Sequence, residues 1–319
     1  MAKAFASTGD TTEKIETLEI VADGVYALTA EGDPNVGAIE GEDFLVCIEA
    51  RATPVAARSW LQKLRQHTDK PVKFLVLTHY HAVRVLGASA FGADAIIASA
   101  ATRRLIEERG MQDWESEFGR MPRLFREPDS IPGLTWPEIT FDEGLRIELG
   151  GDRGAIDLRF CGRGHTAGDI VVWHDKSKTL FAGDLVEAQA ALYTGDAFHK
   201  QWASGTLNKV KAFAPQALIG GRGAVVRGRE DCDAAVEQTR EFLSVMIECV
   251  GRAHSDGAGL KGAFESAHTA LAPKFGHWPI FEHCMPFNVQ RLWDEFDGVD
   301  WPRIWTMERD REVWAQLQD

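Results

Sequence analysis

The stretch 77-LTHYHAVRVLGAS-89 decides the fold, because it places two histidines at the end of a buried strand. His79 and His81 are separated by one residue and follow the apolar run 74–77. Side chains at positions i and i+2 of a strand point the same way, so both imidazoles can converge on one ion. Open α/β sheets also place their sites at the carboxyl ends of strands. Taken alone, the pair is equally typical of two histidines bonded to backbone or solvent.

Two later stretches favour a metal site. The stretch 161-CGRGHTAGDIVVW-173 puts His165 in a glycine-rich turn before a strand, and 178-KTLFAGDLV-186 puts Asp184 directly after one. A glycine precedes each of these two side chains and permits backbone angles that aim it. Three histidines and a carboxylate therefore all follow a strand end or a tight turn, which predicts that they share one ion.

The rest of the chain reads as two blocks of strands, each with single helices. Strands are predicted at 19–21, 25–29, 36–40, 44–48, 72–77, 95–98, 139–141, 145–149, 156–160, 170–174, 179–182 and 217–220. Helices are predicted at 53–66, 99–109 and 206–213, with a helical and irregular insertion at 110–137. Strand blocks alternating with helices, twice over, predict two sheets covered by helices. We expect an N-terminal arm at 1–17, a main domain at 18–228 and a helical C-terminal extension at 229–319.

These motifs, in this order and spacing, resemble the metallo-β-lactamase superfamily from about residue 18 to 228. The resemblance is carried by Thr78–His81, by Gly164–Gly168 and by Phe181–Asp184, and Asn35 fits the family's early pattern. It implies an α/β fold, the four-layer αββα sandwich, with the site along the edge between the sheets. The details around the first and last motifs are similar to the SoxH-type or quinoprotein-relay branch of this superfamily.

The chain departs from the family at the second metal position. Relatives hold that ion with an Asp and a His of the first motif and a His of a late Gly-His-Gly. Here those positions are Val83, Arg84 and Arg222. The histidines of the first position are all present, and so is Asp184, which bridges the two ions in dinuclear relatives. The family's early Asp corresponds to Glu49.

The balance of positive charge at the site explains why two arginines stand at the second metal position. A lost divalent ion removes two positive charges, and Arg84 and Arg222 restore two if they point inward. Guanidinium cannot ligate a metal, but its planar fork suits a carboxylate. We expect one arginine to hold Asp184 as the second ion would, and the other to face the substrate. The alternative is that both arginines turn to solvent or merely fill the vacant position.

The remaining site predicts a mononuclear metallo-hydrolase. Three imidazoles, His79, His81 and His165, with an open position suit one catalytic Zn²⁺ per chain, whose bound water has a pKa of about 7. The resulting hydroxide attacks an ester, lactone, amide or similar bond of a small, anionic substrate. Asp184 orients or deprotonates the water, or is a fourth ligand. Arg84 or Arg222 stabilises the developing anion or docks a substrate carboxylate.

Two alternatives stay open at this stage. Three nitrogen ligands and one oxygen suit Fe²⁺ equally, and the superfamily includes iron-dependent persulfide dioxygenases. A mononuclear iron dioxygenase acting on a small thiol or persulfide-like substrate is therefore the second hypothesis. The third is a non-catalytic protein whose arginine-lined cleft binds an anion.

Three further residues are candidates for contact with the substrate. Tyr193 and His199 belong to 193-YTGDAFHKQW-202, where family members place loop residues on the substrate side, and His283 lies in an aromatic-rich segment of the tail. The alternative for all three is packing in the core or at a dimer interface.

The composition and net charge of the chain limit the kinds of partner that it can bind. The chain has 319 residues and a net charge of −13, from 35 basic and 48 acidic residues, which argues against nucleic acid or an anionic membrane as main partner. Five dispersed cysteines are typical of reduced thiols in a cytoplasmic protein. We expect no signal peptide and no membrane span. We predict a bacterial-type cytoplasmic enzyme with a small-molecule substrate, and the helical tail leaves a homodimer open.

Overall fold

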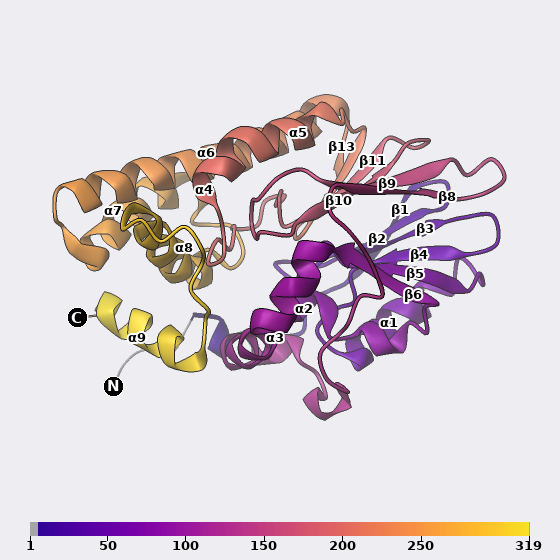
Figure 1. Ribbon diagram of the computed structural model, residues 1–319, viewed down its shortest axis with the longest axis horizontal. Helices are drawn as coiled ribbons and strands as arrows, with labels where there is room; N and C mark the ends of the chain where they lie inside the picture. The colour runs from indigo at the N-terminus through magenta and orange to yellow at the C-terminus, as the bar shows by residue number, and fades with distance from the viewer. Residues whose placement is uncertain (1–5, 319) are drawn as a thin grey trace.

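Two β-sheets packed face to face form the centre of the molecule, and helices cover both outer faces (Figure 1). The computed structural model describes residues 6–318. The first sheet has the order β1-β2-β3-β4-β5-β6-β7 and the second the order β13-β12-β11-β10-β9-β8. The strands of the first sheet are β1 Thr17–Ala22, β2 Val25–Thr29, β3 Val36–Glu40, β4 Leu45–Ile48, β5 Val72–Val76, β6 Ala95–Ser99 and β7 Ile139–Phe141. Those of the second are β8 Gly144–Glu148, β9 Ala155–Phe160, β10 Ile170–His174, β11 Thr179–Gly183, β12 Ala217–Gly220 and β13 Val226–Arg227.

The helices follow the predicted order. They are α1 Pro54–Leu64, α2 Ala82–Val85, α3 Ala100–Arg120, α4 His199–Gln201, α5 Leu207–Ala212, α6 Arg229–Ser255, α7 Gly259–Phe275, α8 Phe281–Phe296 and α9 Met307–Gln318. Short turns of other helix types are η1 Ala6–Gly9, η2 Ala88–Ala90, η3 Pro122–Leu124, η4 Pro128–Ser130 and the π-helical η5 Trp202–Thr206. Thr53 caps α1, because its Oγ1 accepts a hydrogen bond from the amide of Ala56 at 3.2 Å.

Strand alternation explains the four layers. Successive side chains of a strand point to opposite faces. In β2, Val25 and Ala27 enter the core between the sheets, whereas Tyr26 and Leu28 pack in the layer that contains Trp60 of α1. Strands β10, β11 and β12 of the second sheet are buried on both faces in the same way, and their outer face packs against α5 and the C-terminal helices. The predicted αββα sandwich is confirmed.

The C-terminal helices extend the helical layer beyond the sheets. Helices α6, α7 and α8 bury side chains in one core with the outer face of the second sheet. In Figure 1, α7, α8 and α9 gather at one end of the sandwich, near both ends of the chain. Gly228 precedes α6, at the boundary expected from the sequence. The division into a domain and an extension stays a prediction, because the helices share their core with the sheet.

Sequence and structure differ in several places, and the short helices α2 and α4 were not predicted. Helix α3 continues to Arg120, eleven residues beyond the segment 99–109 predicted as helix, and it takes up part of the predicted insertion. The edge strand β13 has only two residues, too few to leave an alternating pattern. Of the predicted arm 1–17, residues 1–5 lie outside the described residues, and η1 forms at its next four positions.

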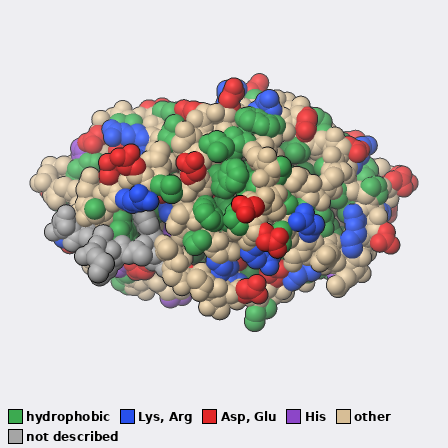
Figure 2. All heavy atoms as spheres, turned by 90° about the horizontal axis from the view of Figure 1, so that it is seen from below, with side chains coloured by type: hydrophobic (Ala, Val, Ile, Leu, Met, Phe, Trp, Pro, Cys, Tyr) green, Lys and Arg blue, Asp and Glu red, His purple; other side chains and the backbone are tan. Residues whose placement is uncertain are grey.

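The surface carries charge of both signs. On the face shown in Figure 2, acidic and basic side chains are interspersed among apolar ones. Within residues 6–318, none of the helices is both long and apolar enough to span a membrane.

Candidate metal centre

Three histidines from separate parts of the fold meet at one edge between the sheets. His79 follows β5, His81 directly precedes α2, and His165 lies in the connection between β9 and β10. Each offers a ring nitrogen, and the three nitrogens lie within 4.8 Å of one another. All three side chains are buried, with at most 2% of their surface exposed. The structure thus brings together the ligand set expected from the sequence.

Neighbouring side chains orient the three rings. The contacts are Nδ1 of His79 to Oγ1 of Thr78 at 2.9 Å, Nε2 of His81 to Oδ2 of Asp196 at 3.3 Å, and Nδ1 of His165 to Oδ1 of Asp169 at 3.3 Å. Ligating histidines in metalloproteins hold their second nitrogen in this way, which sets the ring tautomer. The contacts leave Nε2 of His79, Nδ1 of His81 and Nε2 of His165 for an ion.

Two of the nitrogens that face the cluster have no hydrogen-bond partner among the described residues. Nε2 of His79 and Nε2 of His165 are buried, and within residues 6–318 neither has a hydrogen-bond partner. A buried polar atom without a partner is costly, and a metal ion would satisfy both. Burial lowers the pKa of His79 well below its ordinary value, which keeps the imidazole in the neutral, ligating form. Burial opposes protonation of His165, but Asp169 and Asp184 outweigh it and raise its pKa.

Asp184 lies beside the histidines. It follows Gly183, whose φ of 54° lets the chain turn at the end of β11. Its Oδ2 is 3.7 Å from Nε2 of His79 and 3.8 Å from Nε2 of His165. Two ligands of one tetrahedral zinc ion are about 3.4 Å apart, given bonds of about 2.0–2.1 Å. The carboxylate is therefore close enough to act as a fourth ligand or to bond a water at the ion.

Both arginines point inward and pair with Asp184. Arg84 contacts Oδ1 through Nη2 and donates from Nη1 to the carbonyl of Asn35 at 3.2 Å. Arg222 donates from Nη1 to Oδ2 of Asp184 and to Oε1 of Glu187, each at 3.1 Å. Burial would raise the pKa of Asp184, but the two arginines and His79 hold it well below its ordinary value.

This pairing corrects one expectation from the sequence. We predicted that one arginine would hold Asp184 and that the other would face the substrate. Instead, Arg84 and Arg222 share the same carboxylate, and both are buried. A single carboxylate offers two oxygens, so it can accept from two guanidinium groups at once.

Three acidic residues fix the first motif, and of these only Glu49 was named from the sequence. The amide of Ala82 donates to Asp113 at 2.7 Å and the amide of Val83 to Glu117 at 2.9 Å, so α3 caps the start of α2. Glu49 accepts from the amide of Thr78 at 3.0 Å and has a φ of 65°, which is uncommon outside glycine. Asp169, which contacts His165, lies only four residues after it in the chain, so this contact could have been proposed from the sequence.

The three predicted substrate contacts have different surroundings. The ring centroid of Tyr193 lies 5.4 Å from that of His81 and 6.2 Å from that of His165, so it borders the cluster. His199 has both ring nitrogens engaged, with Glu295 at 3.0 Å and Thr194 at 2.8 Å. It has no nitrogen left for a ligand. His283 contacts the Ser7 hydroxyl through Nδ1.

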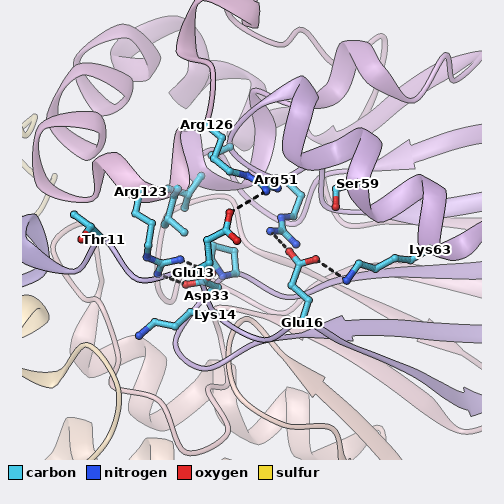
Figure 3. A pocket seen from close by; sticks show the side chains of 14 residues that line it. Thr11, Glu13, Lys14, Glu16, Asp33, Arg51, Ser59, Lys63, Arg123 and Arg126 are labelled. Atoms are coloured by element: carbon cyan, nitrogen blue, oxygen red, sulfur yellow. Dashed lines mark hydrogen bonds and ion pairs between the residues drawn. The ribbon is translucent and has the colours of Figure 1, made fainter.

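A surface cavity of about 420 Å³ lies next to α2, with Val83 in its wall (Figure 3). Its charged residues largely pair with one another: Glu16 with Arg51 at 2.7 Å and with Lys63 at 3.1 Å, and Arg123 with Asp33. None of the three histidines lines it. The metal cluster is therefore enclosed and distinct from this cavity.

Gly221→Ala tests how tightly the arginine pair is packed. A Cβ at this position would collide with Oδ1 of Asp184 and lie 2.8 Å from Nη2 of Arg84. We expect the ion pair to separate and the free energy of unfolding to fall by about 1–3 kcal/mol, as measured by urea denaturation. The control is Gly205→Ala, where no atom lies within 4 Å of the new Cβ. Equal stability of the two variants would contradict the packing described.

Comparisons with known proteins agree with this geometry. The model of a family described as the metallo-beta-lactamase superfamily matches residues 30–221. The chain is 25% identical over 233 residues to the metallo-beta-lactamase IND-1 of Chryseobacterium indologenes, covering 71% of this chain and 80% of that protein. It is 27% identical over 177 residues to the 2,4-dinitroanisole O-demethylase subunit alpha of a Nocardioides species, covering 53% of this chain and 46% of that subunit. Among solved structures, a metallo-beta-lactamase from Pontibacter korlensis is similar with a TM-score of 0.57 and 19% identity, over 72% of this chain and 99% of that one.

Proposed function

The chain belongs to the metallo-beta-lactamase superfamily, and from this premise we propose that it is a hydrolase that works with one divalent metal ion, Zn²⁺. The observation that carries the proposal is the buried cluster of His79, His81 and His165. Its members present nitrogens within 4.8 Å of one another, and two of these have no other partner within residues 6–318. Three imidazoles with an open position are the donor set of catalytic zinc.

The two arginines support a single ion. Arg84 and Arg222 replace histidine ligands of the family's second metal position, and Val83 replaces an aspartate. No guanidinium or alkyl group ligates a cation. The two guanidinium groups instead bring two positive charges to Asp184, the carboxylate that a second divalent ion would contact.

The side chains then have separate roles. A divalent ion held by the three histidines supplies a Lewis acid that activates water near neutral pH. Asp184 stays ionised between Arg84 and Arg222, so it can accept a hydrogen bond from that water and orient it. Tyr193 borders the same histidines and forms part of the wall against which a substrate packs.

The substrate class we propose is a small molecule with an ester, lactone, amide or similar bond. The enclosed position of the histidines favours a small substrate. Two named relatives extend the set to be tested, since one is a beta-lactamase and the other an O-demethylase subunit that acts on 2,4-dinitroanisole. A β-lactam and a methyl aryl ether therefore belong in the same screen.

The test is a screen of esters, lactones, a penicillin and 2,4-dinitroanisole with protein loaded with Zn²⁺, with Fe²⁺ or with neither. We expect turnover with Zn²⁺, loss on chelation and recovery when Zn²⁺ is returned. Oxygen consumption with a thiol by the iron-loaded protein alone would favour the dioxygenase instead. Binding of anions without any turnover would favour the non-catalytic hypothesis.

A further inference from the structure

We propose that Arg120 docks a carboxylate group of the substrate beside Tyr193, whose ring also borders the metal-binding histidines. This inference rests on the proposed function, because it assigns a second anchoring point to the same site. Docking of a substrate carboxylate was predicted for Arg84 or Arg222, but both of their guanidinium groups pair with Asp184.

Arg120 is a buried cation with unused hydrogen-bonding capacity. It is the last residue of α3, and only 2% of its surface is exposed. Its polar contacts to described residues leave from Nε, to the carbonyl of Ser116 at 3.3 Å and to Oδ2 of Asp310 at 3.6 Å. Nη2 is buried and has no hydrogen-bond partner within residues 6–318. Leaving such a donor unpaired is costly, so its position calls for an acceptor that is supplied from outside.

Other buried arginines in the described chain use their terminal nitrogens. Arg291 is equally buried and donates from Nη1 and Nη2 to the carbonyls of Val299 and Asp300, each at 2.9 Å. Arg109 pairs from Nη1 with Asp196 at 3.1 Å. The outer edge of a guanidinium is the edge that binds a carboxylate with two parallel hydrogen bonds. In Arg120 part of this edge is free, whereas in Arg291 carbonyls occupy it.

Tyr193 links Arg120 to the histidines. The guanidinium carbon of Arg120 is 5.4 Å from the centroid of the Tyr193 ring, and the ring of His81 is 5.4 Å from the same centroid. A molecule of a few carbon atoms can therefore reach both groups. The hydroxyl of Tyr193 is buried and has no hydrogen-bond partner within residues 6–318. It can donate to the same carboxylate.

A cavity lies beside the backbone of Arg120. It has a volume of about 120 Å³, and its wall includes Ser7 and Met121. The Ser7 hydroxyl donates to the backbone carbonyl of Arg120 at 2.9 Å, and Met121 is the next residue along the chain. The wall also holds Lys14 and Arg123, which pair with Asp10 and Asp33 of the same wall, so the unpaired donor of Arg120 and not the charge of the cavity selects for an anion.

The test compares carboxylates with their isosteric primary amides, and both are also titrated into metal-free protein, in which the proposed hydrolysis of an amide cannot occur. Acetate, hexanoate, benzoate and glutarate, each beside its primary amide, are titrated into the full-length protein and followed by calorimetry and thermal shift. We expect at least one carboxylate to bind about 10- to 100-fold more tightly than its amide. The preference should persist after metal removal and disappear in Arg120→Gln. Arg120→Lys, which keeps the charge but loses the fork, should retain part of it.

Arg291→Gln is the matched control, since it removes an equally buried guanidinium whose donors are already satisfied, and it should keep the preference. If Arg120→Gln does not fold, Arg120→Lys decides, because an unchanged preference there would overturn the bidentate contact. A preference that vanishes with the metal would mean that the ion, not Arg120, binds the carboxylate, and the inference would be wrong. The absence of any preference for the carboxylate over its amide would also contradict the inference. Lack of hydrolytic turnover would instead count against the proposed function alone.

Discussion

His165→Ala is expected to release the metal ion and to lower kcat/KM for hydrolysis at least about 10³-fold. The substitution removes one of three nitrogens that lie within 4.8 Å of one another. It also leaves Oδ1 of Asp169, 3.3 Å from Nδ1 in the intact protein, without that partner. Two histidines and a carboxylate already paired with two arginines would then remain to hold the ion. Elemental analysis of dialysed protein measures the loss directly.

The matched control for this variant is His254→Ala. His254 is partly exposed and pairs with Asp297 at 2.8 Å, among the C-terminal helices. It should keep the metal content and the activity of the intact protein. Retention of a full equivalent of metal by His165→Ala would show that the ion is bound elsewhere.

Arg84→Met is expected to destabilise the metal-free protein by about 3–5 kcal/mol, because it removes one partner of a buried ion pair and leaves Asp184 less compensated. The loss should be smaller in the metal-loaded protein, since a divalent ion beside Asp184 restores positive charge to the same place. Urea denaturation of both forms measures the two differences.

Arg291→Met serves as the control for this prediction. Arg291 is as buried as Arg84, but the acceptors of its hydrogen bonds include the neutral carbonyls of Ala197, Val299 and Asp300. Its replacement should cost the same amount with and without metal. If Arg84→Met behaves in the same way, the arginine does not substitute for a cation at Asp184.

The sequence was sufficient to predict the fold and the clustering of the three histidines, because both depend on local patterns. Alternation along β2 separates Val25 and Ala27 from Tyr26 and Leu28, and the structure places these pairs on opposite faces. The histidines and Asp184 follow strands or glycine-rich turns, which local composition reveals. Membership of the superfamily, predicted from those motifs, is confirmed by the family match.

The contacts that orient the ligands could not be predicted, because they join residues far apart in the chain. Asp196 contacts His81 across 115 positions, and Asp113 caps α2 from another helix. The pairing of both arginines with Asp184 depends on three connections meeting at one point. His199 was expected near the substrate, but Glu295, 96 residues later, takes one of its nitrogens. No sequence pattern pointed to Arg120, because its proposed role depends on a buried donor that has no acceptor among the described residues.

The central claim is that one metal ion binds to His79, His81 and His165 while Arg84 and Arg222 occupy the position of a second. The most direct test is the metal content of untagged protein, purified after expression with zinc and iron both supplied. We predict one equivalent of zinc per chain, rising to two in the triple variant Val83→Asp, Arg84→His, Arg222→His, which restores the family's second ligand set. Two equivalents in the unmodified protein, or none, would contradict the claim.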